Sequence, residues 1–79
     1  MTADRAVATG FAAMGKPVPF ARRQRAYDAA VSMGVKDAFS LIDGMAEKLQ
    51  RDKPYEAMEM AYKYVDLTGA YRLMATLLT

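Results

Sequence analysis

Apolar residues recur at helical spacing through the middle of the chain, between residues 35 and 51. Their spacing of four, three, four and three positions places them all on one side of a helix. The opposite side carries charged residues, which is typical of a helix that packs on a core with one face and meets water with the other. The apolar stripe consists of Val35, Phe39, Ile42, Ala46 and Leu49.

Two further helices are expected before this one. In residues 3–14 the spacing of Val7, Phe11 and Met14 predicts a helix with one apolar face. Residues 20–33 form the second candidate helix, again with apolar positions that share a face. Because an isolated helix of this length is marginal in water, the first one forms only if its apolar face docks on the rest of the chain.

Glycine and proline mark the boundaries of these segments. Gly15 suits the left-handed conformation that ends a helix, and the two prolines that follow it force an extended path. Gly34 is the natural end of the next helix. We therefore expect an N-terminal helix or arm and a proline-containing linker over residues 1–19, and a helical core over residues 20–79.

The second half of the chain begins another helix at residue 54. Pro54 suits the first turn of a helix, and apolar positions continue at helical spacing to at least residue 67. The short connection from the helix over 35–51 predicts an antiparallel αα-hairpin with the helix over 54–67. The apolar spacing runs on through Gly69, so either this helix continues to residue 78 or it breaks at Gly69 and a short fifth helix covers 70–78. Of the two, we favour a break or bend at Gly69.

Part of this hairpin resembles a known repeat. Residues 53–67 are similar to the second helix of a tetratricopeptide repeat, mainly at Tyr55 and Ala57. The preceding segment departs from that family because Gly44 is out of register, and no second copy follows at the 34-residue period. We treat the similarity as that of a general helical hairpin and transfer no function from it.

The expected fold class is all-α, a small bundle of four or five helices built on the antiparallel αα-hairpin. A chain of 79 residues makes one helical domain, residues 1–79. Its composition is rich in Ala, Leu and Met and poor in β-branched residues, which favours helix over sheet. Chains of this size bury only a thin core, so association with a second copy or another protein is expected.

The composition also excludes most kinds of catalytic and metal-binding site. The chain has no Cys and no His, so it lacks thiol nucleophiles, thiolate ligands and the commonest general base and metal ligand. Carboxylate pairs such as Glu56 and Glu59 fall on faces that the spacing marks as exposed, and exposed carboxylates make poor acid–base catalysts. We therefore expect no enzyme activity, no catalytic residues, no metal, no cofactor and no small-molecule substrate.

Tyrosine and methionine gather in residues 55–71, with more apolar surface than one core face needs. One stripe contains Met58, Ala61, Tyr62 and Val65. The second stripe is the candidate partner-binding surface, because Tyr and Met are enriched at protein interfaces. The alternatives are that both stripes are buried within the domain, or that the tyrosines stack with nucleic-acid bases. The candidate partner-binding residues are Met60, Tyr64, Leu67, Tyr71 and Met74.

Positive charge concentrates near the start of the predicted core. Lys16, Arg22, Arg23 and Arg25 form a basic patch with no acidic residue between Lys16 and Arg25, although the whole chain has a net charge of only +2. Arginine forks match phosphate oxygens, so nucleic-acid binding through this patch is one hypothesis. The alternatives are contact with an acidic protein and an ordinary solvated helix face.

From these features we expect a small, non-enzymatic protein–protein interaction module that acts as an adaptor or inhibitor. Its size and composition are typical of phage- or mobile-element-encoded inhibitors of host defence and of small virion components. The alternative is a basic nucleic-acid-binding accessory protein that uses Lys16 to Arg25. No membrane span or signal peptide is expected, which favours a cytoplasmic location, and the module is expected to form homo-oligomers.

Overall fold

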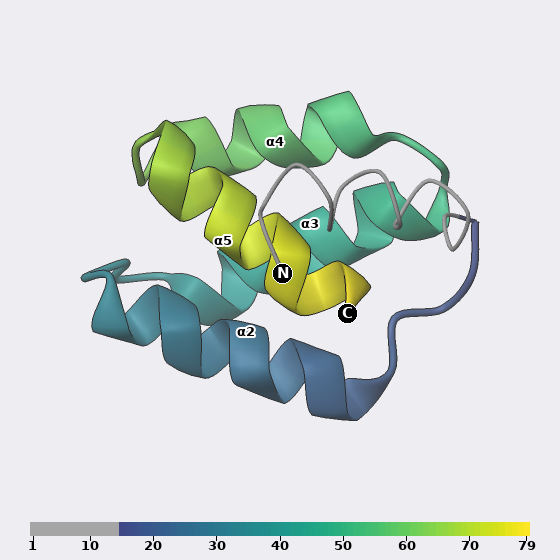
Figure 1. Ribbon diagram of the computed structural model, residues 1–79, viewed down its shortest axis with the longest axis horizontal. Helices are drawn as coiled ribbons and strands as arrows, with labels where there is room; N and C mark the ends of the chain where they lie inside the picture. Colours follow the sequence, from purple (N-terminus) through teal and green to yellow (C-terminus); the bar gives the residue numbers. More distant parts are fainter. Residues whose placement is uncertain (1–14) are drawn as a thin grey trace.

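A computed structural model describes residues 15–79, and within that range it contains four helices and no strand (Figure 1). The expected all-α class is therefore confirmed. The helix expected over residues 3–14 lies outside the described residues. The four helices are α2 (Phe20–Ser32), α3 (Ala38–Gln50), α4 (Pro54–Tyr62) and α5 (Leu67–Leu78).

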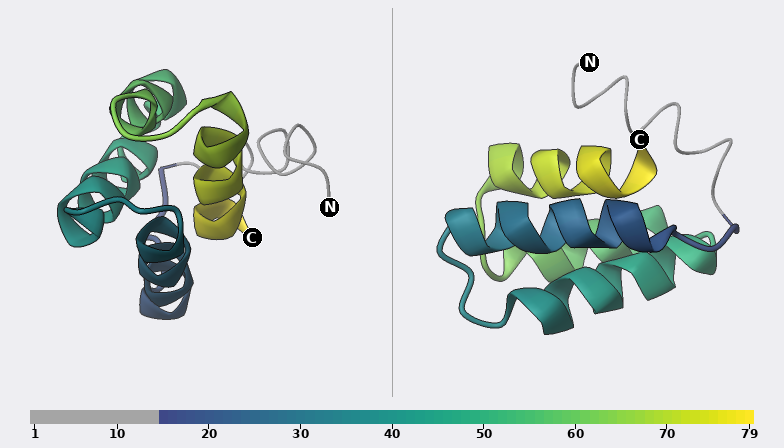
Figure 2. Two further views of the ribbon diagram at one scale, coloured as in Figure 1. Left: turned by 90° about the vertical axis from the view of Figure 1, so that its left-hand side faces the viewer. Right: turned by 90° about the horizontal axis from the view of Figure 1, so that it is seen from below.

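The helices enclose a single core. Each helix packs against its neighbour in the chain, and α5 also packs against α2, which closes the arrangement. The left view of Figure 2 shows the four helices around a common centre. Helices α3 and α5 supply the largest fully buried side chains. Helix α2 buries two alanines and Tyr27, and α4 buries mainly alanine together with Met58. The largest fully buried side chains are Ile42, Met45, Leu49, Leu73, Met74 and Leu77.

Helix α2 ends as the sequence predicts, at Gly34. This residue has a φ of +86°, which costs little for glycine because it has no Cβ. The Gly34 amide donates to the Val31 carbonyl (3.0 Å), and the Val35 amide donates to the Ala30 carbonyl (3.1 Å). These two bonds form a Schellman motif, which satisfies the last carbonyls of the helix and turns the chain towards α3.

Helix α3 starts later than expected. The predicted helix began at Val35, but α3 begins at Ala38, because the Val35 amide is used to close the end of α2. Val35 is still buried, as a residue of the connection. The expected core position of Phe39 is wrong, since its side chain is 63% exposed.

The predicted helix over 54–67 is wrong in its second part. Helix α4 ends at Tyr62, and residues 63–66 form a connection before α5. Asp66 caps α5, because its carboxylate accepts a hydrogen bond from the Gly69 amide at 2.8 Å. The expected break at Gly69 is therefore wrong as well, since Gly69 lies inside α5. A Cβ there would stand 3.0 Å from the Cβ of Val65, so glycine lets the connection pack closely on the helix.

Gly44 of α3 lies against the Met60 side chain of α4. A Cβ at this position would collide with the terminal methyl group of Met60. The glycine therefore leaves room for a long side chain from the neighbouring helix, which partly buries Met60 against the core. This agrees with the use of glycine at helix contacts, despite its low helix propensity.

Candidate interaction surfaces

The five candidate partner-binding residues do not form one helix face. Met60 belongs to α4 and lies against α3, whereas Tyr64 lies in the connection after α4. Leu67 is the first residue of α5 and is 55% exposed. Tyr71 is half-buried, and Met74 is fully buried in the core. The single continuous stripe expected from the spacing is thus wrong, because the chain turns between α4 and α5.

The turn instead creates an apolar groove between α4 and α5. We call it the α4–α5 groove, and it has a volume of about 300 Å³. Tyr55 and Tyr62 stand along it and are 77% and 47% exposed. Exposed tyrosines of this kind offer a large contact area with few rotatable bonds. The groove is lined by Pro54, Tyr55, Met58, Glu59, Tyr62, Tyr71 and Met74.

Sequence spacing assigned the groove residues to two different surfaces. Met58 and Tyr62 fell in one stripe of the predicted helix, and Tyr71 and Met74 fell in the other. Because α5 folds back beside α4, the two stripes meet at the groove. The missed signal was the capping residue Asp66, which predicts a new helix start before Leu67.

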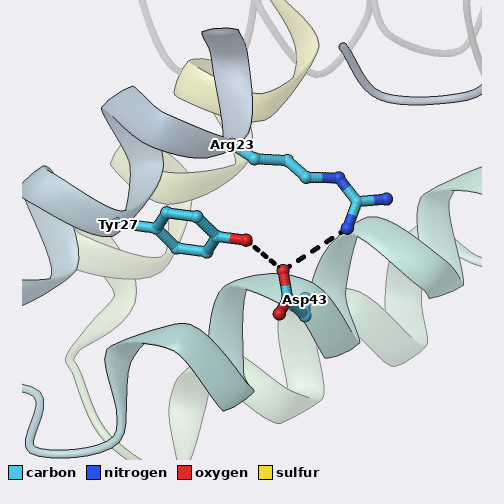
Figure 3. Close-up of polar contacts among 3 residues, drawn as sticks. All are labelled: Arg23, Tyr27 and Asp43. Carbon is cyan, nitrogen blue, oxygen red and sulfur yellow. Dashed lines mark hydrogen bonds and ion pairs between the residues drawn. The ribbon is translucent and has the colours of Figure 1, made fainter. Parts of the chain in front are cut away.

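The basic patch is also divided, because α2 directs its arginines to two sides. Arg23 points towards α3, where its guanidinium lies 3.3 Å from a carboxylate oxygen of Asp43. The Tyr27 hydroxyl donates a hydrogen bond to the same oxygen (Figure 3). Arg23 therefore links α2 to α3 and is partly neutralised there. The other three residues of the predicted basic patch take no part in this contact.

Lys16, Arg22 and Arg25 lie on the side of the molecule where α2 meets α5. Lys16 and Arg22 line a hollow of about 240 Å³ whose floor includes Leu77. Arg25 lines a second, larger hollow between α2 and α5, and Arg72 of α5 lines it too. Sequence analysis missed Arg72, because it lies 47 residues along the chain from Arg25.

Tyr27 is the centre of the contact between α2 and α3. Its ring is buried, and the centroid of the ring lies 4.6 Å from that of the Phe39 ring. Although Phe39 is largely exposed, it therefore contributes an aromatic contact between α2 and α3. The hydrogen bond to Asp43 raises the pKa of the Tyr27 hydroxyl above its usual 10.0, and burial and the negative charge of Asp43 act in the same direction. The neutral phenol is therefore the form that the folded protein favours.

This environment predicts a loss of stability in alkali. Folded Tyr27 holds its proton more tightly than unfolded Tyr27, so its contribution is complete below a pH of 10.0 and is lost as pH rises through the raised folded pKa. We expect the free energy of unfolding, measured with urea from neutral pH to about pH 11, to decline less steeply in Tyr27→Phe than in the wild type. Tyr55→Phe, at an exposed position, should leave the decline unchanged. If the free energy of unfolding declined equally steeply with pH in the wild type and in Tyr27→Phe, the raised pKa of Tyr27 would be contradicted.

No group of three or more carboxylates within residues 15–79 is placed to hold a metal ion. None of the four described helices combines the length and the apolar character needed to cross a bilayer. Comparison with protein-family models, with curated proteins and with solved structures finds no match for the chain.

Proposed function

We propose that this protein is a non-enzymatic interaction module, an adaptor or inhibitor, which binds an apolar helix of a partner protein in the α4–α5 groove. The observation that carries the proposal is the pair of exposed tyrosines along an apolar hollow formed by two adjacent helices. A groove between two helices accepts the apolar face of a third, with anchors about one turn apart. Tyr and Met are the residue types that such interfaces favour.

The dimensions of the groove suit a short helix. Helix α4 has nine residues, so the groove extends for about 14 Å, or two and a half helical turns. Apolar side chains at positions i, i+4 and i+7 of a partner helix would span that length. Met58 and Met74 form the floor, and methionine side chains adapt to anchors of different shape.

Charge at the rim narrows the chemistry of the partner. Glu59 lines the groove, and no basic side chain of residues 15–79 lies within 4.0 Å of its carboxylate. Its neighbour Glu56 differs, since it is held by Lys48 and Lys53 at 3.7 and 3.8 Å. A partner helix with a lysine or arginine beside its apolar anchors would complement Glu59. The proposed occupant is therefore an amphipathic, basic helix.

The proposal is tested with a displayed library of helical peptides that are randomised on one face. We expect selection on the wild-type protein to enrich apolar anchors spaced i, i+4 and i+7 together with Lys or Arg. Tyr62→Ala should weaken binding of the selected peptides by about 10- to 100-fold, as expected when a central interface tyrosine is removed. Glu59→Gln should weaken the basic peptides by a few-fold and mainly through the rate of association.

Phe20→Ala provides the matched control. Phe20 is an exposed aromatic residue of α2, 71% exposed and outside the groove lining, so its removal should leave peptide binding unchanged. Equal binding by wild type and Tyr62→Ala, or enrichment of acidic peptides, would overturn the proposal. A wild-type dimer in sedimentation that Tyr62→Ala converts to monomer would also overturn it, because a second copy would then occupy the groove.

A further inference from the structure

Folding separates the charges of this protein onto two sides. The segments 15–32 and 67–79, which contain α2 and α5, carry five basic residues and one acidic residue. The intervening segment 33–66, which contains α3 and α4, carries five basic and seven acidic residues. A chain with a net charge of only +2 thus has one strongly basic side. The sequence alone, with bases spread over both halves, does not show this.

Four of the five basic residues of segments 15–32 and 67–79 are outside the ion pairs of the described residues, and the fifth, Arg23, pairs with Asp43 of α3. The four ion pairs among residues 15–79 all use carboxylates of α3 or α4, namely Asp43, Glu47 and Glu56. Four other cations have no described carboxylate within 4.0 Å and follow the contact between α2 and α5. We call them the basic seam, and they are Lys16, Arg22, Arg25 and Arg72.

The seam lines two hollows, and residues of both α2 and α5 line each of them. Arg25 and Arg72 approach the larger hollow from opposite helices, and its volume is about 490 Å³. Arg22 lies one turn before Arg25 on α2 and joins Lys16 at the smaller hollow. The first turn of α2 has no acidic residue, so the positive end of its helix dipole adds to the same field.

From this arrangement we propose that the basic seam binds the phosphate backbone of a nucleic-acid duplex, without sequence readout. Protein surfaces that bind nucleic acid are more polar and more positive than those that bind protein, and the larger hollow is lined by arginine, serine and threonine. Arginine presents donors that match phosphate oxygens in pairs. Duplex is favoured over single strand because none of the described residues that line the two hollows is aromatic, so bases have no ring there to stack on.

An acidic residue, Asp28, lies beside the basic seam and allows a second test of the proposed phosphate binding. It lines the larger hollow beside Arg25 as the one acidic residue among the described residues that line the two hollows. Its carboxylate would repel a phosphate placed between Arg25 and Arg72. The proposal therefore makes opposite predictions for acids and bases of the same surface: Asp28→Asn should tighten binding, and loss of an arginine should weaken it.

The test is fluorescence anisotropy with a labelled DNA duplex of about 20 base pairs, titrated with the full chain. If the four cations each neutralise one phosphate, affinity should fall on the order of 100-fold between about 50 and 200 mM salt. Arg72→Gln and Arg25→Gln should each weaken binding about fivefold at low salt and lower the salt slope by about one. Asp28→Asn should strengthen binding by a few-fold.

Arg51→Gln is the matched control, since it removes the same charge from the α3 side, where Arg51 pairs with Glu47 at 2.8 Å. It should bind the duplex as the wild type does, apart from a small effect of net charge. Equal weakening by Arg51→Gln and Arg72→Gln would overturn the proposal, as would an absence of binding at low salt. Binding of poly-glutamate or single-stranded DNA at least as tight as that of the duplex would overturn it too, and Tyr62→Ala should have no effect.

Discussion

Leu73→Ala is expected to lower the free energy of unfolding by about 2–5 kcal/mol. Leu73 is fully buried at the centre of α5, so its truncation leaves a cavity that the surrounding helices fill only in part. A domain of this size has a total stability of about 4–12 kcal/mol, so the loss is a large share of it. We expect the midpoint of thermal unfolding, followed by circular dichroism at 222 nm, to fall by at least about 10 °C.

Leu67→Ala is the control, because it makes the same change six residues earlier in the same helix. Leu67 is 55% exposed, so its truncation removes little buried surface and should cost below about 1 kcal/mol. Equal losses in the two variants would mean that α5 does not present the Leu73 face to the core. A larger loss in Leu67→Ala would favour the continuous helix that the apolar spacing predicts through residues 60–74.

The helices that sequence analysis placed well are those whose boundaries are set by local conformation. Gly34 ends α2 because only glycine takes a φ of +86° easily, and that requirement is readable in the sequence. Pro54 starts α4 at the first helical position, as expected. The start of α3 was misplaced because the Val35 amide is used by the end of α2, and apolar spacing does not reveal which helix a backbone amide serves.

The break between α4 and α5 shows a different limit. The spacing of Met60, Tyr64 and Leu67 is that of one helix, yet the chain turns between the first and the last of them. Helices α4 and α5 each bury an apolar face, and the two faces happen to be in register in the sequence. The helical spacing of apolar residues therefore continues across the turn, although the helix does not. The capping signal of Asp66 was present in the sequence and decides the outcome, because it supplies a hydrogen bond that a continuous helix does not need.

The two candidate surfaces depend on contacts that spacing cannot give. The α4–α5 groove needs Tyr62 and Tyr71 on facing helices, and the basic seam needs Arg72 beside Arg25. The two residues of each pair lie on different helices, and the spacing of residues within one helix does not show which helices lie side by side. Arg23 shows the reverse case, since it belonged to the predicted patch but lies on the α3 side with Asp43. Identifying basic residues was therefore easier than deciding which of them share a surface.

Ala26→Leu is expected to destabilise the protein by about 1–3 kcal/mol, although it adds apolar surface. Ala26 is fully buried in the middle of α2, and its small side chain lets this helix approach the core closely. A leucine there has no space to fill, so α2 must move outward or its neighbours must leave their preferred rotamers. We expect a lower urea midpoint and, because Arg25 moves away from Arg72, weaker duplex binding at low salt.

Ala21→Leu makes the same change at an exposed position five residues earlier in α2. Its effect on stability should stay within about 0.5 kcal/mol, because the added side chain meets only solvent and leucine has nearly the helix propensity of alanine. If Ala26→Leu were as stable as Ala21→Leu, α2 would have room above the core, and its close packing could not be what sets the distance between Arg25 and Arg72. The pair of variants therefore tests whether the tight alanine contact of α2 also positions the basic seam.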